Sequence, residues 1–374
     1  MSSDVPVFGV LSTYPPTACG LATFSAALSK GLATLGAPAR VVRITDGSVS
    51  TERNVVGELV NGSPRSLAAA ARLLNECDIA VVQHEYGVYG GTDGDDVLQI
   101  LDALDVPSMV VAHTILLHPT LHQRAVLVDV VAAATQVVVM SESARARLCS
   151  SFDVDPAKIM TIPHGAATPA PVAMPTGRPT MLSWGLLGPG KGVERVIDAL
   201  PSLRHHTFRP RYLVAGQTHP KVLAADGEAY RNARIEQAWR NGVAASVSFD
   251  AAYRDVPSLT SLVQASTLVV LPYDSTDQVT SGVLVDAISA GRPVVATAFP
   301  HAVELLDSGA GIVVPHDDPD AMVRALDQVL THPGVAHTMA AEAARLAPTM
   351  GWPVVAGAYL RVAQELLADR AALV

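Results

Sequence analysis

Short apolar runs alternate along this chain with longer segments whose apolar residues recur every three or four positions. The short runs are rich in Val, Leu and Ala, which is typical of strands that a parallel sheet buries on both faces. The longer segments carry one apolar face, as helices that pack on such a sheet do. The pattern therefore predicts an α/β protein. The expected strands are residues 6–11, 39–44, 79–83, 108–112, 136–140, 158–162, 180–185, 211–216, 246–250, 268–272, 293–297 and 311–314, and the expected helices include 21–35, 64–75, 95–104, 121–134 and 141–152.

A Pro- and Ala-rich segment, residues 165–179, interrupts this alternation and has neither helical nor strand periodicity. Such a composition is typical of a linker. At 374 residues the chain is also longer than one typical domain core. We therefore expect two Rossmann-like domains, residues 1–168 and 169–350, and a C-terminal amphipathic helix within residues 351–374. The carboxyl ends of the two parallel sheets are expected to face each other across a deep cleft.

The composition is that of a well-buried globular protein, with 49% hydrophobic and 16% charged residues. A net charge of −9 argues against binding to nucleic acid and against strong association with anionic membranes. The N-terminus lacks the basic and apolar regions of a signal peptide, and no apolar stretch reaches the roughly 18 residues that a membrane span needs. Three distant cysteines predict neither a disulfide framework nor a zinc site. We expect a cytoplasmic enzyme.

The most informative segment is residues 269–297, in which a strand, a polar loop, a helix and a second strand follow one another. Thr280, Ser281 and Gly282 stand where that helix begins. The free N–H groups and the dipole at a helix amino end suit a phosphate or a diphosphate. Asp286 follows about one turn later, where its carboxylate could accept hydrogen bonds from ribose hydroxyls. The segment therefore predicts a nucleotide diphosphate site.

A glycine-rich loop, Ser183–Gly192, adds a second element of the same kind. Gly188 and Gly190 permit a tight turn between the end of a strand and the start of a helix. Lys191 stands at that helix start, so its ammonium group and free N–H groups converge where an anion could bind. Two phosphate-type loops in one Rossmann-like half favour a nucleotide diphosphate site over the alternative, an ordinary βαβ crossover with a solvated lysine.

Together these residues resemble the donor-site signature of retaining GT-B glycosyltransferases of family 4, also called group 1, in an actinobacterial-looking branch. Their usual pattern is Glu, seven residues, Glu, and these positions fall on Gln278 and Asp286 here. The diphosphate-binding Lys of the family falls on Lys191, whereas its Arg falls on Leu186. Gln278 can bind a sugar hydroxyl but cannot act as an anion, and one of two expected cations is missing. The resemblance implies a GT-B fold whose last helix crosses back to the N-terminal domain.

The resemblance also implies roles for residues in the first half of the chain. Gly20 lies in the loop after the first strand, which family members present to the sugar and the acceptor. His113 matches the position whose imidazole contacts the transferred sugar, where it can donate a hydrogen bond or carry a proton near neutral pH. The alternative for His113 is a strand-end histidine that bonds to the backbone. His84 and Glu85 are expected to shape the acceptor side.

Two further residues match a narrower branch of the family. His219 and Arg231 could reach the diphosphate or the sugar, and Arg231 could replace the missing Arg. The acidic runs at residues 93–96 and 317–320 are typical of helix starts, not of metal sites. We therefore expect no metal and no other cofactor.

The resemblance implies a hexosyltransferase that acts with retention on a soluble saccharide acceptor, in oligosaccharide, polysaccharide or glycoconjugate biosynthesis. His113, Lys191 and Gln278 are its expected catalytic residues, and GDP-mannose is slightly preferred as the donor. The alternatives are a UDP-glucose-dependent glucosyltransferase, a GT-B sugar-nucleotide epimerase or hydrolase, and a non-catalytic nucleotide-sugar sensor. The expected partners are a nucleotide sugar and an acceptor, and a homodimer is left open.

Overall fold

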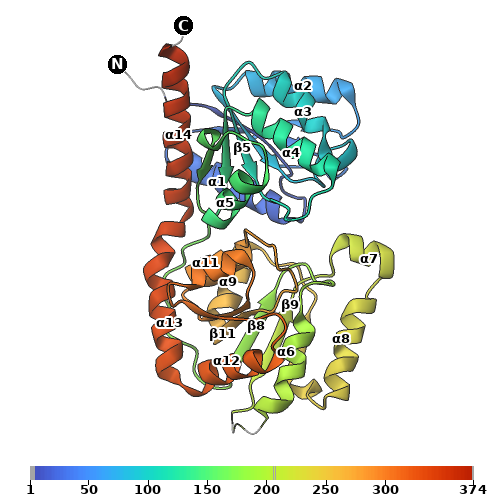
Figure 1. The fold of residues 1–374 in the computed structure, drawn as a ribbon, viewed down its shortest axis with the longest axis vertical. Helices are drawn as coiled ribbons and strands as arrows, with labels where there is room; N and C mark the ends of the chain where they lie inside the picture. The colour runs from blue at the N-terminus through green and yellow to red at the C-terminus, as the bar shows by residue number, and fades with distance from the viewer. Residues whose placement is uncertain (1–4, 205, 207, 373–374) are drawn as a thin grey trace. The chain divides into compact units, whose positions relative to one another are not determined.

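The structure is a computed structural model that describes residues 5–204, 206 and 208–372 (Figure 1). The chain divides into two compact units. Unit 1 consists of Met1–Gly165 and Trp352–Val374, and unit 2 consists of Ala166–Gly351. The final helix thus groups with the first part of the chain, and each unit is built around one parallel sheet.

Unit 1 contains a seven-stranded sheet with the order β3-β2-β1-β4-β5-β6-β7, in which every neighbouring pair is parallel. The strands are β1 (Phe8–Ser12), β2 (Ala39–Ile44), β3 (Val55–Leu59), β4 (Ile79–His84), β5 (Ser108–Ala112), β6 (Gln136–Val139) and β7 (Ile159–Thr161). Strands β1, β4 and β5 are buried along their whole length, as expected of apolar runs in the middle of a sheet. The sequence pattern missed β3, because this edge strand is half-exposed and carries Gly57 and Glu58.

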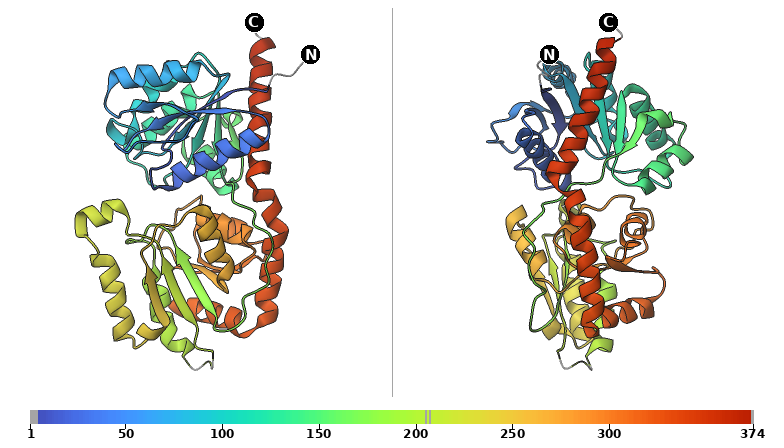
Figure 2. Two further views of the ribbon diagram at one scale, coloured as in Figure 1. Left: turned by 180° about the vertical axis from the view of Figure 1, so that it is seen from behind. Right: turned by 90° about the vertical axis from the view of Figure 1, so that its left-hand side faces the viewer.

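Helices pack on both faces of this sheet (Figure 2). They are α1 (Gly20–Thr34), α2 (Pro64–Asn75), α3 (Asp96–Asp102), α4 (Leu121–Ala133), α5 (Glu142–Ser151) and α14 (Trp352–Ala372), with short 3-10 turns η1 (Thr92–Gly94) and η2 (Pro156–Lys158). Phe24 of α1 and Tyr359 of α14 join the same buried core on one face. The two helices approach closely because Gly31 has no side chain: a Cβ there would lie 2.9 Å from the Cβ of Ala356.

Unit 2 contains a six-stranded parallel sheet with the order β10-β9-β8-β11-β12-β13. Its strands are β8 (Thr180–Trp184), β9 (Arg211–Ala215), β10 (Val247–Asp250), β11 (Leu268–Leu271), β12 (Val294–Thr297) and β13 (Gly311–Val314). Its helices are α6 (Val193–Ala199), α7 (Pro220–Asp226), α8 (Ala229–Arg240), α9 (Val256–Ala265), α10 (Gly282–Ser289), α11 (Pro300–Leu306), α12 (Pro319–Thr331) and α13 (Pro333–Leu346), with the 3-10 turns η3 (Leu200–Leu203), η4 (Ala244–Ser246) and η5 (Ala347–Met350). Separate apolar clusters fill the two faces of this sheet.

In each sheet, successive strands of the chain lie first toward one edge and then, after a switch near the middle, toward the opposite edge. This point lies between β1 and β4 in unit 1, and between β8 and β11 in unit 2. Doubly wound proteins bind ligands at such points, because the loops that follow the two strands diverge and leave a crevice at the carboxyl ends. The functional residues expected from the sequence lie mostly on these loops.

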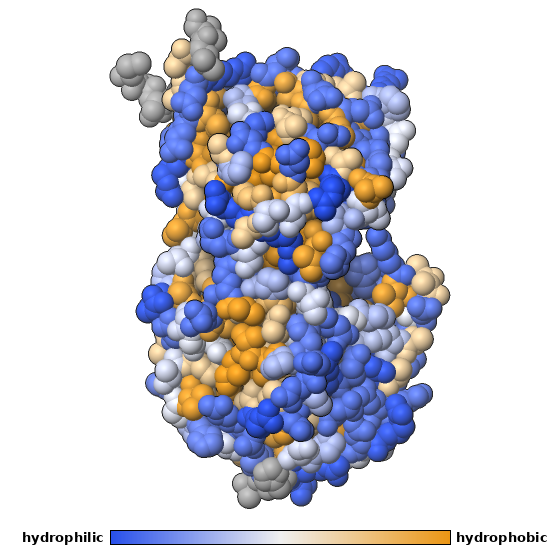
Figure 3. Space-filling view, viewed as in Figure 1, coloured by the Kyte–Doolittle hydropathy of each residue, from blue (hydrophilic) through white to orange (hydrophobic). Residues whose placement is uncertain are grey.

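No helix in the described part of the chain combines the length and the apolar composition that a membrane crossing requires. On the face drawn in Figure 3, polar and apolar side chains are interspersed over the surface of each unit.

Candidate functional site

The loop between β8 and α6, residues 185–192, can adopt its path only with glycine at key points. Gly192 has a φ of 64°, and a Cβ there would lie 1.7 Å from the carbonyl oxygen of Pro272, which follows β11. Gly216, after β9, has a φ of 127°, and its Cβ would lie 2.0 Å from the carbonyl oxygen of Gly185. The lack of side chains therefore lets the loops after β8, β9 and β11 meet at one end of the sheet.

Lys191 is the cation of this loop, and its side chain is partly buried. Its Nζ lies over the ring of Tyr273, 4.7 Å from the ring centroid. Burial lowers the pKa of Lys191. Among the described residues, no carboxylate or hydrogen-bond acceptor contacts this ammonium group. A buried cation without a counter-ion is costly, so the geometry suits an anionic ligand.

Helix α10 begins with a cap that uses two of its four outermost N–H groups. The Oγ of Ser281 accepts a hydrogen bond from the N–H of Leu284 at 3.2 Å. The N–H of Ser281 in turn donates to Nδ1 of His301 at 2.8 Å, a partner that the sequence did not indicate. Within the described part of the chain, the N–H groups of Gly282 and Val283 have no partner. These two groups are therefore free for a ligand.

Three polar side chains surround this helix start. The Oγ1 of Thr280 is buried without a hydrogen-bond partner among the described residues. The Nε2 of Gln278 donates to the carbonyl oxygen of Thr280 at 2.9 Å, a bond that a glutamate could not make because it has no N–H. Burial raises the pKa of Asp286 to about 7. Since no described residue bonds to this carboxyl group, it can accept hydrogen bonds from a ligand.

Arg231 is bound to the loop after β9. Its Nε donates to Glu228 at 3.0 Å, and its Nη2 donates to the carbonyl oxygen of Gly216 at 2.8 Å and to Thr218 at 3.3 Å. The residue is 7% exposed. Arg231 therefore supports the loop that packs on Gly185, and only its Nη1 lacks a described partner.

His219 lies next to the glycine-rich loop. Its N–H donates to the carbonyl oxygen of Leu187 at 2.8 Å, and its Nδ1 accepts from the N–H of Lys221 at 3.2 Å. A Cβ at Gly188 would come within 3.1 Å of Val222, one turn into the same helix. The first turn of α7 thus packs directly on the loop that carries Lys191.

The sequence analysis missed Arg195, which ties three loops of unit 2 together. Its Nε and Nη2 donate to Oδ1 of Asp274 at 3.0 and 2.8 Å, and its Nη1 donates to the carbonyl oxygen of His316. The N–H of Asp274 donates to the carbonyl oxygen of Gly190 at 3.0 Å. The one available signal was its place on α6, four residues after Lys191.

In unit 1, three polar side chains lie at the carboxyl ends of β4 and β5. The Nε2 of His113 and the Oε1 of Gln83 are 2.6 Å apart. Burial, with smaller effects of His164 and His84, lowers the pKa of His113 to about 3. His113 is therefore neutral at neutral pH and has one ring N–H there, not two. Burial also lowers the pKa of His84 to about 4, and neither of its ring nitrogens has a described partner.

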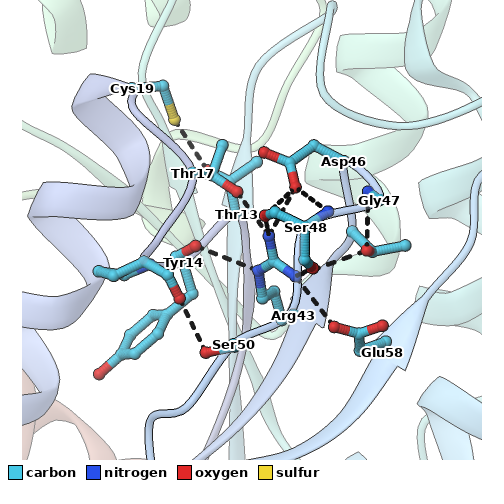
Figure 4. Close-up of polar contacts among 12 residues, drawn as sticks. Thr13, Tyr14, Thr17, Cys19, Arg43, Asp46, Gly47, Ser48, Ser50 and Glu58 are labelled. Atoms are coloured by element: carbon cyan, nitrogen blue, oxygen red, sulfur yellow. Dashed lines mark hydrogen bonds and ion pairs between the residues drawn. The ribbon is translucent and has the colours of Figure 1, made fainter.

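The loop after β1 is held by the fully buried Arg43 of β2 (Figure 4). The guanidinium group donates to oxygen atoms of Tyr14, Thr17, Thr45, Asp46, Ser48 and Glu58. Gly20 begins α1 immediately after this loop, and a side chain there would meet open space. Glu85 follows β4, and its Oε2 accepts from the N–H of Gly87 at 2.8 Å.

The structure thus brings Gly188, Gly190, Lys191, Gln278, Thr280, Ser281, Gly282 and Asp286 to one end of the unit 2 sheet. It places Gly20, His84, Glu85 and His113 at the carboxyl ends of the central strands of unit 1. Among the described residues, no group of three or more His, Cys, Asp or Glu side chains is arranged to hold a metal ion.

Solved structures with the same fold are glycosyltransferases and related synthases. A glycosyltransferase of Rickettsia africae has a TM-score of 0.76 at 15% identity, covering 96% of this chain and 98% of that one. Sucrose-phosphate synthase of Thermosynechococcus elongatus has a TM-score of 0.77 at 17% identity, covering 97% and 100%. HepE of Anabaena, in complex with UDP-glucose, has a TM-score of 0.72 at 17% identity, covering 98% and 100%. These likenesses confirm the expected GT-B fold with two Rossmann-like domains.

Sequence comparisons identify the family. Residues 19–168 match the family described as Glycosyltransferase Family 4, and residues 178–332 match the family described as Glycosyl transferases group 1. A D-inositol 3-phosphate glycosyltransferase of Kineococcus radiotolerans is 27% identical over 275 residues. That match covers 65% of this chain and 60% of the relative, so the chain spans less than two thirds of it. Because the two matched families cover most of both Rossmann-like units, this chain belongs to the group 1, family 4 glycosyltransferases.

Proposed function

We propose that this glycosyltransferase binds a nucleotide diphosphate hexose in unit 2 and transfers the hexose, with retention of configuration, to a hydroxyl group of a saccharide acceptor. The observation that carries the proposal is the partly buried ammonium group of Lys191, which lies on Tyr273 and has no anionic partner in the described part of the chain. A diphosphate would supply the missing negative charge.

Each donor group has a candidate partner at this end of unit 2. Lys191 and the free N–H groups of Gly282 and Val283 would bind the diphosphate. The buried hydroxyl group of Thr280 lies beside them on the chain and lacks a described partner. Asp286 would accept hydrogen bonds from the ribose hydroxyls. The carboxamide oxygen of Gln278 would accept one from the hexose, while its Nε2 stays bonded to the backbone.

In the proposed reaction, the bond between the anomeric carbon and the diphosphate oxygen breaks, and the acceptor oxygen bonds to the same face of that carbon. The acceptor proton passes to the departing phosphate oxygen, so no side chain has to act as the base. This agrees with the neutral state of His113, to which we assign a hydrogen bond to the sugar. We propose no metal ion or cofactor, because Lys191 and the helix N–H groups would stabilise the leaving charge.

We assign acceptor binding to unit 1, through Gly20 and Glu85, whereas the expected acceptor residue His84 is fully buried and does not reach the surface. The relative from Kineococcus radiotolerans is named for an inositol phosphate, so inositol 3-phosphate is one acceptor to test beside oligosaccharides. The residues of the donor site are compatible with GDP-mannose. A UDP-glucose-dependent reaction is the second candidate, because HepE, which shares the fold, was solved with UDP-glucose.

Thermal stabilisation by a panel of nucleotide sugars tests donor binding directly. A ligand at one hundred times its dissociation constant adds about 2.7 kcal/mol to the free energy of unfolding. GDP-mannose or UDP-glucose is expected to raise the melting temperature, whereas the free sugars are not. If no nucleotide sugar stabilises the protein, the proposal is wrong.

Release of the free nucleotide, measured with and without acceptor, separates the functional alternatives. A transferase releases nucleotide only with an acceptor, and a hydrolase releases it without one. An epimerase changes the sugar while the nucleotide stays attached, and a sensor binds the donor but does neither. The proposal requires the first outcome, and each of the others contradicts it.

A further inference from the structure

The turn between β12 and α11, residues 297–301, holds the loop between β11 and α10, residues 272–281, at several separate points. The Oγ1 of Thr297 donates to the carbonyl oxygen of Tyr273 at 2.6 Å. The ring of Phe299 stacks on the ring of Tyr273, with centroids 5.4 Å apart and planes 26° apart. This is the aromatic ring on which the ammonium group of Lys191 lies. The 297–301 turn therefore supports one of the two candidate phosphate-binding elements through Tyr273.

His301 connects the same turn to the other element, the start of α10. Its N–H donates to the carbonyl oxygen of Gln278 at 3.3 Å, and its Nδ1 accepts from the N–H of Ser281 at 2.8 Å. His301 is 4% exposed and Ser281 is 2% exposed, so water does not compete for these bonds. The two contacts fix both ends of the four-residue turn that leads into the helix.

The ionisation state of His301 suits this contact. Burial lowers the pKa of His301 to about 4, and the nearby Glu304 opposes the shift only partly. The ring is therefore neutral at neutral pH and has one nitrogen that accepts and one that donates. Since Nδ1 accepts from Ser281, the ring proton is on Nε2.

The contact completes a cap that α10 cannot make by itself. In a capping box, the side chain three residues after the N-cap accepts a hydrogen bond from the N–H of the N-cap residue. That position is occupied by Leu284 here, whose side chain has no hydrogen-bond acceptor. His301 supplies the acceptor from a neighbouring helix. The N–H groups of Ser281 and Leu284 are then satisfied, and those of Gly282 and Val283 are left to bind a ligand.

We propose that His301 is a positioning residue for donor binding, which fixes the amino end of α10 so that its two free N–H groups meet the diphosphate of the donor. The proposal rests on the donor function proposed for α10. It gives the 297–301 turn a role in the donor site.

Two variants separate the acceptor atom from the bulk of the ring. In His301→Asn the side-chain oxygen lies near the place of Nδ1 and can still accept from Ser281. In His301→Leu the volume is nearly kept but no acceptor remains. The control is His337→Ala, on the exposed side of α13 and outside the site.

Hydrogen–deuterium exchange of the ligand-free protein tests the anchoring without any donor. In His301→Leu, amide exchange in residues 278–284 is expected to rise about tenfold, because one buried hydrogen bond is lost. His301→Asn is expected to stay within about threefold of the wild type, and the control is expected to be unchanged. Unchanged exchange in His301→Leu would overturn the proposal.

Steady-state kinetics with UDP-glucose or GDP-mannose, whichever the wild type uses, tests the consequence for donor binding. His301→Leu is expected to raise the donor KM about tenfold with kcat within about twofold, and His301→Asn to restore most of the loss. A loss of stability alone would lower the amount of active enzyme and leave KM unchanged, which contradicts the proposal. If the wild type binds neither nucleotide sugar, the proposed function fails, while the exchange experiment still decides whether His301 anchors α10.

Discussion

Two cations, the fully buried Arg43 of unit 1 and the partly buried Lys191 of unit 2, lie at the loop that follows the first strand of a Rossmann-like sheet, and their surroundings differ. Arg43 of unit 1 has 0% of its side chain exposed and bonds to backbone, hydroxyl and carboxylate oxygens, including Asp46 at 2.7 Å and Glu58 at 2.9 Å. Lys191 of unit 2 is partly buried, and it contacts an aromatic ring and no described carboxylate. The same overall topology therefore supports two different uses of a buried positive charge.

The difference distinguishes a structural cation from one that is prepared for a ligand. A guanidinium group with all its donors bonded fixes the loop around it and has nothing left for a ligand. A buried ammonium group without an anion destabilises the ligand-free protein and is stabilised when an anion binds. A substitution of Arg43 should therefore lower the stability of the protein, whereas a substitution of Lys191 should lower its affinity for the ligand.

The largest effect on stability is expected for Arg43→Met. The variant removes the bonds that hold the loop after β1 to the loop after β2, and we expect the free energy of unfolding to fall by about 3 kcal/mol. Urea denaturation monitors this change. Arg40→Met, on the same strand, is the matched control, because the Arg40–Glu76 ion pair is exposed and contributes less than about 1 kcal/mol. Equal losses in the two variants would show that the Arg43 network has no special role.

Lys191→Met tests the opposite behaviour. The affinity for the nucleotide sugar that stabilises the wild type is expected to fall about a hundredfold, which is about 2.7 kcal/mol. The ligand-free variant should be at least as stable as the wild type, because an unpaired buried charge is removed. Isothermal titration calorimetry and thermal unfolding measure the two quantities. Lys221→Met, on the exposed side of α7, should change neither.

The fold could largely be predicted from the sequence because most strands are buried on both faces and appear as apolar runs. Strand β3 could not, since an exposed edge strand needs no such run and carries Gly57 and Glu58. Some site residues could also be predicted, because Lys191 and Thr280 stand near helix starts that follow buried strands. The place of a helix start depends on the local sequence, so the pattern of apolar and polar residues indicates it.

Hydrogen-bond partners depend on the tertiary structure and were not predictable. His301 of α11 bonds to Ser281, although α10 and β12 lie between them in the sequence, and no spacing rule connects them. Arg231 is one candidate to replace the missing family Arg. In the structure its guanidinium group bonds to Glu228 and to the loop at Gly216, and its Nη1 has no described partner. A sequence shows that a charge is present, but only the fold shows whether that charge is already paired.

Asp286 extends the comparison to a partly buried acid whose carboxyl group has no described partner. Its pKa rises from 3.8 to about 7, so between these values the folded protein keeps a proton that the unfolded chain has lost. The contribution of Asp286 to the free energy of unfolding therefore falls as the pH rises from about 4 to 7, and it does not change further above pH 7. Buried histidines such as His84, with a lowered pKa, contribute with the opposite sign. The effect of Asp286 must therefore be measured as a difference between variant and wild type.

In Asp286→Asn this difference is expected to be near zero at pH 4 and to reach about 2 kcal/mol in favour of the variant at pH 8, allowing for partial solvent screening. Urea denaturation at several pH values gives the difference. Asp226→Asn, at the exposed end of α7, should show no such trend. A difference that does not grow with pH would mean that Asp286 is ionised in the folded protein at low pH, as an acid with a partner is.

The smallest expected effect comes from adding the cation that other family members have. Leu186 lines the same small cavity as Lys191 and Tyr273, and it is partly exposed. Leu186→Arg should lower the dissociation constant for UDP or GDP about three- to tenfold, and the gain should shrink at high salt because the added charge is partly screened. Leu186→Met is the neutral control. If the arginine variant binds UDP or GDP no better than the methionine variant, a second cation adds nothing to the binding of the diphosphate. Lys191 and the α10 N–H groups then suffice for this binding.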